Sequence, residues 1–214
     1  MKKQDSLNRR NFLKTTVATA GGLAGVIMLP QCGRAGNSAA AESIHIVGPR
    51  AGYSPQVGTL VSMLNWMRNV VVNTVQGLST ADLDYIHDPK ANSIGAMLLH
   101  LAALDVFYQV NTFTKRKKFN EDEKKQWQTA LDLGEPARKE IKGHPLSYYL
   151  DTLQHVRENT LAQFRQRDDD WLMQVDPSFF GNQPTNNYCK WFHVCEHESN
   201  HNGQIKWILG RLKG

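Results

Sequence analysis

A disulfide framework is the first thing missing from this chain of 214 residues. It has only three cysteines, Cys32, Cys189 and Cys195. The last two are six residues apart in an expected helix, and the rise of about 9 Å between them is too long for an unstrained bridge. A disulfide-stapled scaffold is therefore excluded, and we expect both residues to be buried free thiols.

An excess of charge of one sign is also missing once the first 40 residues are set apart. The chain has 25 Lys and Arg against 20 Asp and Glu, but residues 1–40 hold six of the basic residues and one of the acidic residues, which leaves 19 of each. The basic run 115–118 is soon followed by the acidic run 121–123, which favours a solvated helix end and loop. Bulk charge thus gives no support for nucleic-acid binding, and we expect no nucleic-acid partner.

Alternating strand patterns and internal repeats are absent as well. Apolar residues instead recur three and four positions apart. This spacing predicts four long helices, over about 55–76, 93–112, 146–165 and 186–212, with short helices at 80–84 and 121–131. About 170 residues after the leader suffice for one core. The economical fold is all-α, an up-and-down four-helix bundle.

Local signals predict where these helices begin and end. Ser54 before Pro55 is a plausible helix start, and Ser79 with Asp82 three positions later predicts a capping box. Gly134, Pro136 and Gly143 are expected to break the chain between the second and third long helices.

The first forty residues predict an export signal. The segment Asn8–Lys14 reads NRRNFLK and matches the twin-arginine motif, which implies export of an already folded protein. The apolar run 15–29 contains glycines and threonines and is too weak for a permanent membrane span. We expect residues 1–41 to be a signal peptide or lipoprotein leader with its linker, and residues 42–214 to be one domain.

Two processing sites remain open. The segment Ala39–Ala41 fits cleavage by a signal peptidase just before Glu42. Leu29–Cys32 resembles a lipoprotein box, although Gln31 is a poor residue before the cysteine. The first predicts a periplasmic protein, and the second a protein tethered to a membrane through Cys32.

The clearest chemical feature lies near the end of the chain. His197 and His201 are four residues apart and stand on one face of the last expected helix, a spacing with which a helix offers two imidazoles to one metal ion. His100 lies far upstream in an apolar run and points inward by its spacing to Met97 and Leu104. If the fold joins these helices, the result is a three-histidine metal site with open coordination positions.

This pattern resembles the DinB-like (damage-inducible) family of metal-binding four-helix bundles. The matching stretches are 92–101, which ends near His100, and 197–205, which reads HESNHNGQI. The resemblance runs from about Tyr53 to Leu212 and implies that His100, His197 and His201 are metal ligands. It also suggests a homodimer. Family members often carry a histidine and a basic residue where this chain has Asn200 and Asn202.

Residues beside the ligand pair are candidates for further roles. His193, one turn before His197, is expected to line the pocket or support a ligand, and with Glu198 it is a candidate catalytic residue. A solvated face is the favoured interpretation of Glu196 and Glu198. Close approach of another helix or a loop would explain Gly203 inside a helix. Separately, three aromatic residues of this helix are expected in the core: Trp191, Phe192 and Trp207.

Three histidines with a free position suit zinc, nickel, iron or manganese. The ion can activate water, which predicts a hydrolase of unknown small-molecule substrate, or it can bind a thiol, which is the thiol transferase activity of some family members. A cytoplasmic cofactor thiol would rarely meet an exported protein, so hydrolysis is the leading hypothesis. The alternatives are a thiol transferase and a non-catalytic metal-binding or stress-response bundle.

Overall fold

A computed structural model describes residues 43–212. The twin-arginine motif, Cys32 and the cleavage site after Ala41 lie outside the described residues, so the predictions made for them stay predictions.

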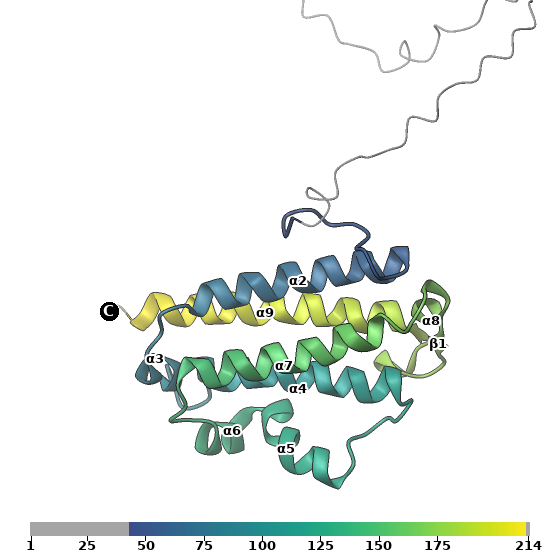
Figure 1. Cartoon of the computed structure of the whole chain (residues 1–214). Coiled ribbons are helices and arrows are strands. Elements are labelled where there is room, and N and C mark those ends of the chain that lie inside the picture. Colours follow the sequence, from purple (N-terminus) through teal and green to yellow (C-terminus); the bar gives the residue numbers. More distant parts are fainter. Residues whose placement is uncertain (1–42, 213–214) are drawn as a thin grey trace, which may run out of the picture. The chain divides into compact units, whose positions relative to one another are not determined.

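Four long helices form the bundle in Figure 1. They are α2 (Pro55–Val75), α4 (Ile94–Phe113), α7 (Leu146–Phe164) and α9 (Asn187–Leu212). The helices α2 and α9 lie side by side, as do α4 and α7, and α4 also packs against α9. The predicted all-α bundle is confirmed, and the predicted helix ends agree to within one or two residues.

The chain directions differ from the expected up-and-down order, because a long connection separates the second and third long helices. Gly95 meets Tyr149 and Asp105 meets Arg157, so α4 and α7 run parallel. Between them the segment with α5 (Glu121–Asp132) and α6 (Gly134–Glu140) returns the chain to the end where α4 began. The helices therefore run up, down, down and up, which sets α4 antiparallel to α9.

The apolar stripes read from the sequence form the core, and α4 is its centre. Among the described helices only α4 could cross a membrane by length and composition, with a mean hydropathy of 1.3, yet 83 % of that window is buried inside the protein. Burial against α5, α7 and α9 accounts for its apolar character. Gly95 is required here, because a Cβ atom would stand 2.6 Å from the Tyr149 hydroxyl.

The connections differ from expectation in two places. Leu133 and Gly134 take left-handed backbones that end α5, as the glycine predicted. Pro136 does not break the chain there but lies in the first turn of α6, where a proline loses no hydrogen bond. After α8 (Asp169–Met173) a two-residue strand pair forms, β1 (Val175–Asp176) with β2 (Thr185–Asn186), around the 3₁₀ turn η2 (Phe180–Asn182). No strand pair was expected there, since two residues are too few to show alternation.

Helix caps follow the predicted chemistry. The short helix α3 (Thr80–Asp84) begins with the full capping box of Ser79 and Asp82. Ser54 does not cap α2 with its own side chain. Asp169 of α8 accepts hydrogen bonds from the backbone N–H groups of Gln56 and Val57 instead, and from the Ser54 hydroxyl at 2.6 Å. These bonds join the start of α2 to α8.

A buried ion network crosses the bundle, with one residue from each long helix: Arg68, Asp105, Arg157 and Glu198. We call this the ion quartet. Arg157 donates to the Asp105 carboxylate at 2.9 Å and to Glu198 Oε1 at 2.6 Å, and Arg68 donates to Glu198 Oε1 at 2.7 Å. The guanidinium groups also bond to the carbonyls of Leu153 and Leu64. Two positive and two negative charges therefore cancel inside the core.

Two expectations about cysteines and aromatics need correction. Cys195 is a buried free thiol, as predicted, but Cys189 is exposed, because it lies on the outward side of the first turn of α9, whose inward residues Lys190 and Trp191 are buried. Trp191 is fully buried, whereas Phe192 and Trp207 are 52 % and 46 % exposed. These two residues lie on faces of α9 that no other described helix covers.

Candidate metal centre

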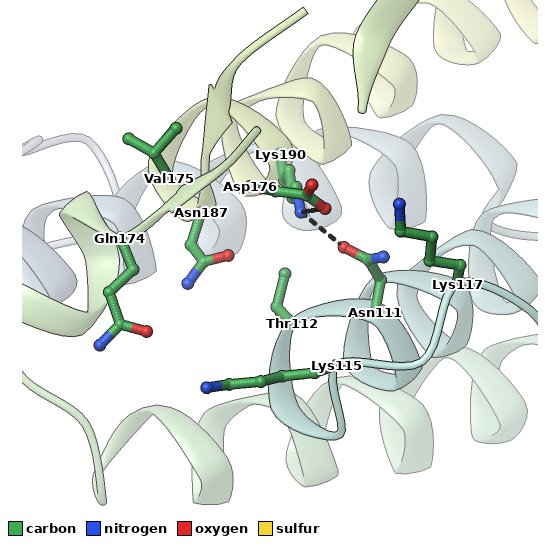
Figure 2. A pocket seen from close by; sticks show the side chains of 9 residues that line it. All are labelled: Asn111, Thr112, Lys115, Lys117, Gln174, Val175, Asp176, Asn187 and Lys190. Atoms are coloured by element: carbon green, nitrogen blue, oxygen red, sulfur yellow. Dashed lines mark hydrogen bonds and ion pairs between the residues drawn. The ribbon is translucent and has the colours of Figure 1, made fainter. Parts of the chain in front are cut away.

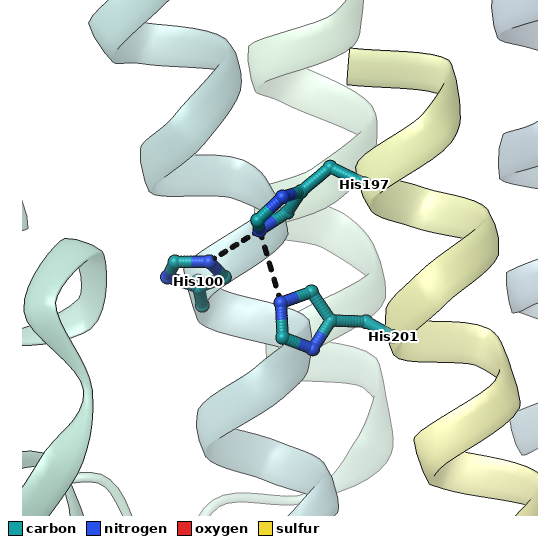
Figure 3. A group of neighbouring side chains, drawn as sticks. All are labelled: His100, His197 and His201. Atoms are coloured by element: carbon teal, nitrogen blue, oxygen red, sulfur yellow. Dashed lines mark hydrogen bonds between the residues drawn. The ribbon is translucent and has the colours of Figure 1, made fainter. Parts of the chain in front are cut away.

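The three predicted ligands converge, as Figure 3 shows. His197 and His201 stack on one face of α9, and His100 reaches them from α4. The His197 Nε2 atom lies 2.8 Å from Nε2 of His100 and 3.0 Å from Nε2 of His201. Nitrogens that share one tetrahedral zinc ion stand about 3.3 Å apart, so a small opening of the cluster suffices for a cation.

Neighbouring oxygens fix where the protons of two imidazoles lie. The Nδ1 of His100 is 2.9 Å from the carbonyl oxygen of Ala130, at the end of α5. The Nδ1 of His201 is 3.2 Å from Oε1 of Gln204. Both oxygens accept hydrogen bonds, so both Nδ1 atoms carry the proton and both Nε2 lone pairs point into the cluster.

Burial keeps the histidines neutral. It lowers the pKa of His197 to about 3, helped by repulsion from His201, His100 and His193. Burial and the charge of His100 lower the pKa of His201 to about 4. Burial also lowers the pKa of His100, although the hydrogen bond to the Ala130 carbonyl opposes this shift. Neutral imidazoles are the form that binds a metal.

Without a cation this arrangement is unfavourable. The single N–H of a neutral His197 can lie between only one pair of the converging Nε2 atoms, so at least two lone pairs face each other at close range. His100 and His201 are each only 7 % exposed, and water can therefore do little to relieve the conflict. The donor set and its hydrogen-bonded supports fit a divalent transition metal.

His193 lies beside the cluster and outside it. Its ring is 5.4 Å from that of His197, and its Nδ1 is 3.2 Å from the Glu196 carboxylate. Rings of Phe180 and Tyr108 flank it at 5.1 and 6.1 Å. His193 thus lines the space next to the three histidines, in the place expected from the sequence.

The interpretation of Glu198 as part of a solvated face is wrong. Its side chain is 1 % exposed and its Oε1 belongs to the ion quartet, so the carboxylate neutralises Arg68 and Arg157. We therefore assign Glu198 a structural role in place of the catalytic role considered above. The exposed residue Glu196 does fit the predicted solvated face.

An open pocket of about 510 Å³ lies one residue contact away from the cluster, because its lining includes Gln204 but none of the three histidines. Gln204, whose Oε1 is 3.2 Å from Nδ1 of His201, lines this pocket. So does Met97, which lies one turn before His100 on α4. Gly203 lines it, and nothing lies within 4 Å of where its Cβ would stand. The expected close approach at Gly203 is therefore absent, and the glycine instead widens the pocket.

Two supports of the site could not be predicted from the sequence. The Ala130 carbonyl is a backbone group on a linker helix, and no side-chain pattern marks it. Gln204 was visible as the residue after Gly203, but its contact with His201 follows only from the helix geometry, at a spacing of three.

Comparison with known proteins gives one match. The family model described as mycothiol S-transferase, a DinB-like family, matches residues 59–214. Among curated proteins, none matches this chain.

Proposed function

Because the chain belongs to the mycothiol S-transferase family, we propose that it is a metal-dependent transferase that joins a small-molecule thiol to an electrophilic substrate. The supporting observation is the set of Nε2 lone pairs that converge from His100, His197 and His201 inside the bundle. The family match favours this reaction over the hydrolysis expected from the sequence.

The roles of the chain's own residues follow from the geometry. A divalent cation held by the three histidines would supply positive charge that lowers the pKa of a thiol toward neutrality. Ala130 and Gln204 orient two of the imidazoles. His193 is partly exposed beside the cluster, with Nδ1 3.2 Å from the Glu196 carboxylate, and a ring nitrogen in this position can accept the thiol proton.

The electrophile has a place next to the site. The pocket beside Gln204 has mostly apolar walls, formed by Met97, Trp207 and Ile208, with amides at its rim. Such walls suit an apolar or aromatic electrophile, and they limit the water that would compete for it.

Hydrolysis is the second candidate. The same neutral histidines suit activation of water, and the twin-arginine motif favours a reaction that needs no cytoplasmic thiol. We also propose export by the twin-arginine route. Replacing Arg9 and Arg10 by lysine should retain the protein in the cytoplasm, and mass spectrometry of the mature N-terminus will distinguish Glu42 from lipidated Cys32.

A conjugation assay separates the two reactions. The purified protein, loaded in turn with zinc, nickel, iron and manganese, is incubated with mycothiol or N-acetylcysteine and an aryl halide, and the thioether is measured by mass spectrometry. A p-nitrophenyl ester tests hydrolysis in parallel. We expect a metal-dependent thioether that is lost in His197→Ala and retained in His155→Ala, whose histidine is exposed.

The outcomes are distinct. Ester turnover without thioether formation would favour the hydrolase. Neither reaction, together with a metal-dependent gain in thermal stability, would favour the non-catalytic metal-binding bundle.

A further inference from the structure

A second pocket lies at the other end of the histidine face of α9. It has a volume of about 270 Å³ and is formed by the end of α4, the loop after it, β1 and the first turn of α9. Lys190 in its wall precedes His197 by seven residues, about 10 Å along the helix. The pocket shares no lining residue with the histidine cluster.

Positive charge surrounds this pocket. Figure 2 shows Lys115, Lys117 and Lys190 around the space, with Asp176 as the one carboxylate among the lining residues. Three lysines against one aspartate leave two positive charges. The other lining groups include the side-chain amides of Asn111, Asn187 and Gln174. Those of Asn111 and Asn187 each donate one hydrogen bond to a backbone carbonyl and have a second N–H.

Lys190 is a buried and hydrogen-bonded part of the pocket wall. It is only 2 % exposed, and its Nζ donates to Asn111 Oδ1 at 2.8 Å and to Asp176 Oδ2 at 2.9 Å. The Phe179 ring lies 4.2 Å from the same nitrogen. An ammonium that is held on these sides keeps its position at the pocket, so binding costs no further loss of side-chain entropy.

The other two lysines have no carboxylate of their own. Within residues 43–212, neither Lys115 nor Lys117 forms an ion pair, because the nearby acidic run is used elsewhere: Glu123 by Arg116, Glu121 by Lys124 and Asp122 by Lys125. Lys115 also adopts a left-handed backbone with φ 59°, uncommon for a lysine, which turns the chain out of α4.

We propose that this pocket binds a small doubly charged anion, a phosphate or a dicarboxylate, between Lys115, Lys117 and Lys190. The charge of such an anion cancels the two uncompensated positive charges. Lysines act as point charges toward phosphate and carboxylate oxygens. The volume excludes a large ligand and suits a compact one. The site is independent of the proposed reaction.

Calorimetry with inorganic phosphate and with succinate tests the proposal. The full-length protein is treated with chelator first, so that binding to a metal cannot contribute, and ionic strength is held constant with KCl. We expect at least one of the two anions to bind the unmodified protein. The double variant Lys115→Gln/Lys117→Gln should bind it roughly tenfold more weakly or worse, because two charge-assisted contacts are lost.

Lys118→Gln is the matched control, since Lys118 is equally exposed in the same loop but does not line the pocket. It should bind like the unmodified protein. Equal affinity in the double variant, equal losses in Lys118→Gln, or no binding of either anion by the chelator-treated protein would each overturn the proposal. All three substitutions are on the surface, so the folded state is preserved for the comparison.

Discussion

Two polar clusters interrupt the core of this bundle, and they are built on opposite rules. The ion quartet is closed: two guanidinium groups and two carboxylates cancel, and three oxygens of the two carboxylates accept hydrogen bonds, while Glu198 Oε2 has no partner. The histidine cluster is open: it brings lone pairs together with no positive charge to receive them. The first arrangement serves folding, and the second serves binding.

This contrast shows that buried ionisable residues have two different roles in this bundle. Both clusters contain ionisable groups that are nearly inaccessible to water, so burial alone does not identify a functional site. The distinguishing observation is whether the protein itself balances the cluster: the quartet has equal numbers of opposite charges, whereas the histidines bring acceptor lone pairs together.

The largest effect on folding should come from opening the quartet. Arg157→Met leaves Asp105 and Glu198 as buried carboxylates with one guanidinium between them, at an expected cost of about 3–5 kcal/mol in the free energy of unfolding. Urea denaturation measures it. Arg165→Met, on the exposed end of α7, is the control and should cost little. A cost below about 1 kcal/mol for Arg157→Met would show that the quartet is not a folding element.

The histidine cluster should respond in the opposite way. His197→Ala removes a crowded neutral imidazole, so the metal-free protein should change by less than about 1 kcal/mol, or gain stability, although bound metal falls to background. Elemental analysis and chelator-dependent thermal denaturation check both parts. Full metal stoichiometry in this variant contradicts the assignment of the site.

Acid should destabilise the metal-free protein through the same residues. The folded-state pKa of His197 is about 3 and that of His201 about 4, both below the ordinary value of 6.5. The unfolded chain therefore binds more protons below about pH 6.5, and stability falls as pH is lowered through this window. Urea denaturation at several pH values measures the slope, which should be smaller in the double variant His197→Ala/His201→Ala.

Removing a residue that orients a ligand should weaken metal binding less than removing the ligand itself. Gln204→Ala removes the acceptor for His201 Nδ1 and should weaken metal binding about tenfold, with the fold intact. A competition titration with a chelating dye measures it. Asn159→Ala, an exposed amide on α7, provides a comparison that should leave affinity unchanged.

The smallest effect should come from Gly203. Nothing obstructs a Cβ atom there, so Gly203→Ala should stabilise the helix by about 1 kcal/mol. If the glycine keeps the pocket wide, the same variant should raise KM for the electrophile without lowering kcat. Destabilisation would indicate a close contact that the described residues do not show.

The helices and the inward faces of the histidines could be predicted because both follow from spacing along single helices, whereas the meeting of His100 with His197 and His201 was implied only by the family resemblance. His197 and His201 share a face at a spacing of four, and His100 shares its face with Met97 and Leu104. The burial of Glu198 could not be predicted from its own helix, where a charged residue is read as solvated. A signal existed on another helix: Arg68 stands in the apolar stripe of α2, four residues after Leu64 and three before Val71.

The hydrogen bond between His100 Nδ1 and the Ala130 carbonyl makes the position of a metal-facing imidazole depend on the linker that contains α5. Since α5 is outside the four-helix bundle proper, shortening or loosening the segment 114–145 would shift the imidazole of a residue it does not contain. Variation in this segment could thus tune metal retention while every ligand stays the same. Slower hydrogen exchange of the amides near Ala130 on metal loading would be its signature.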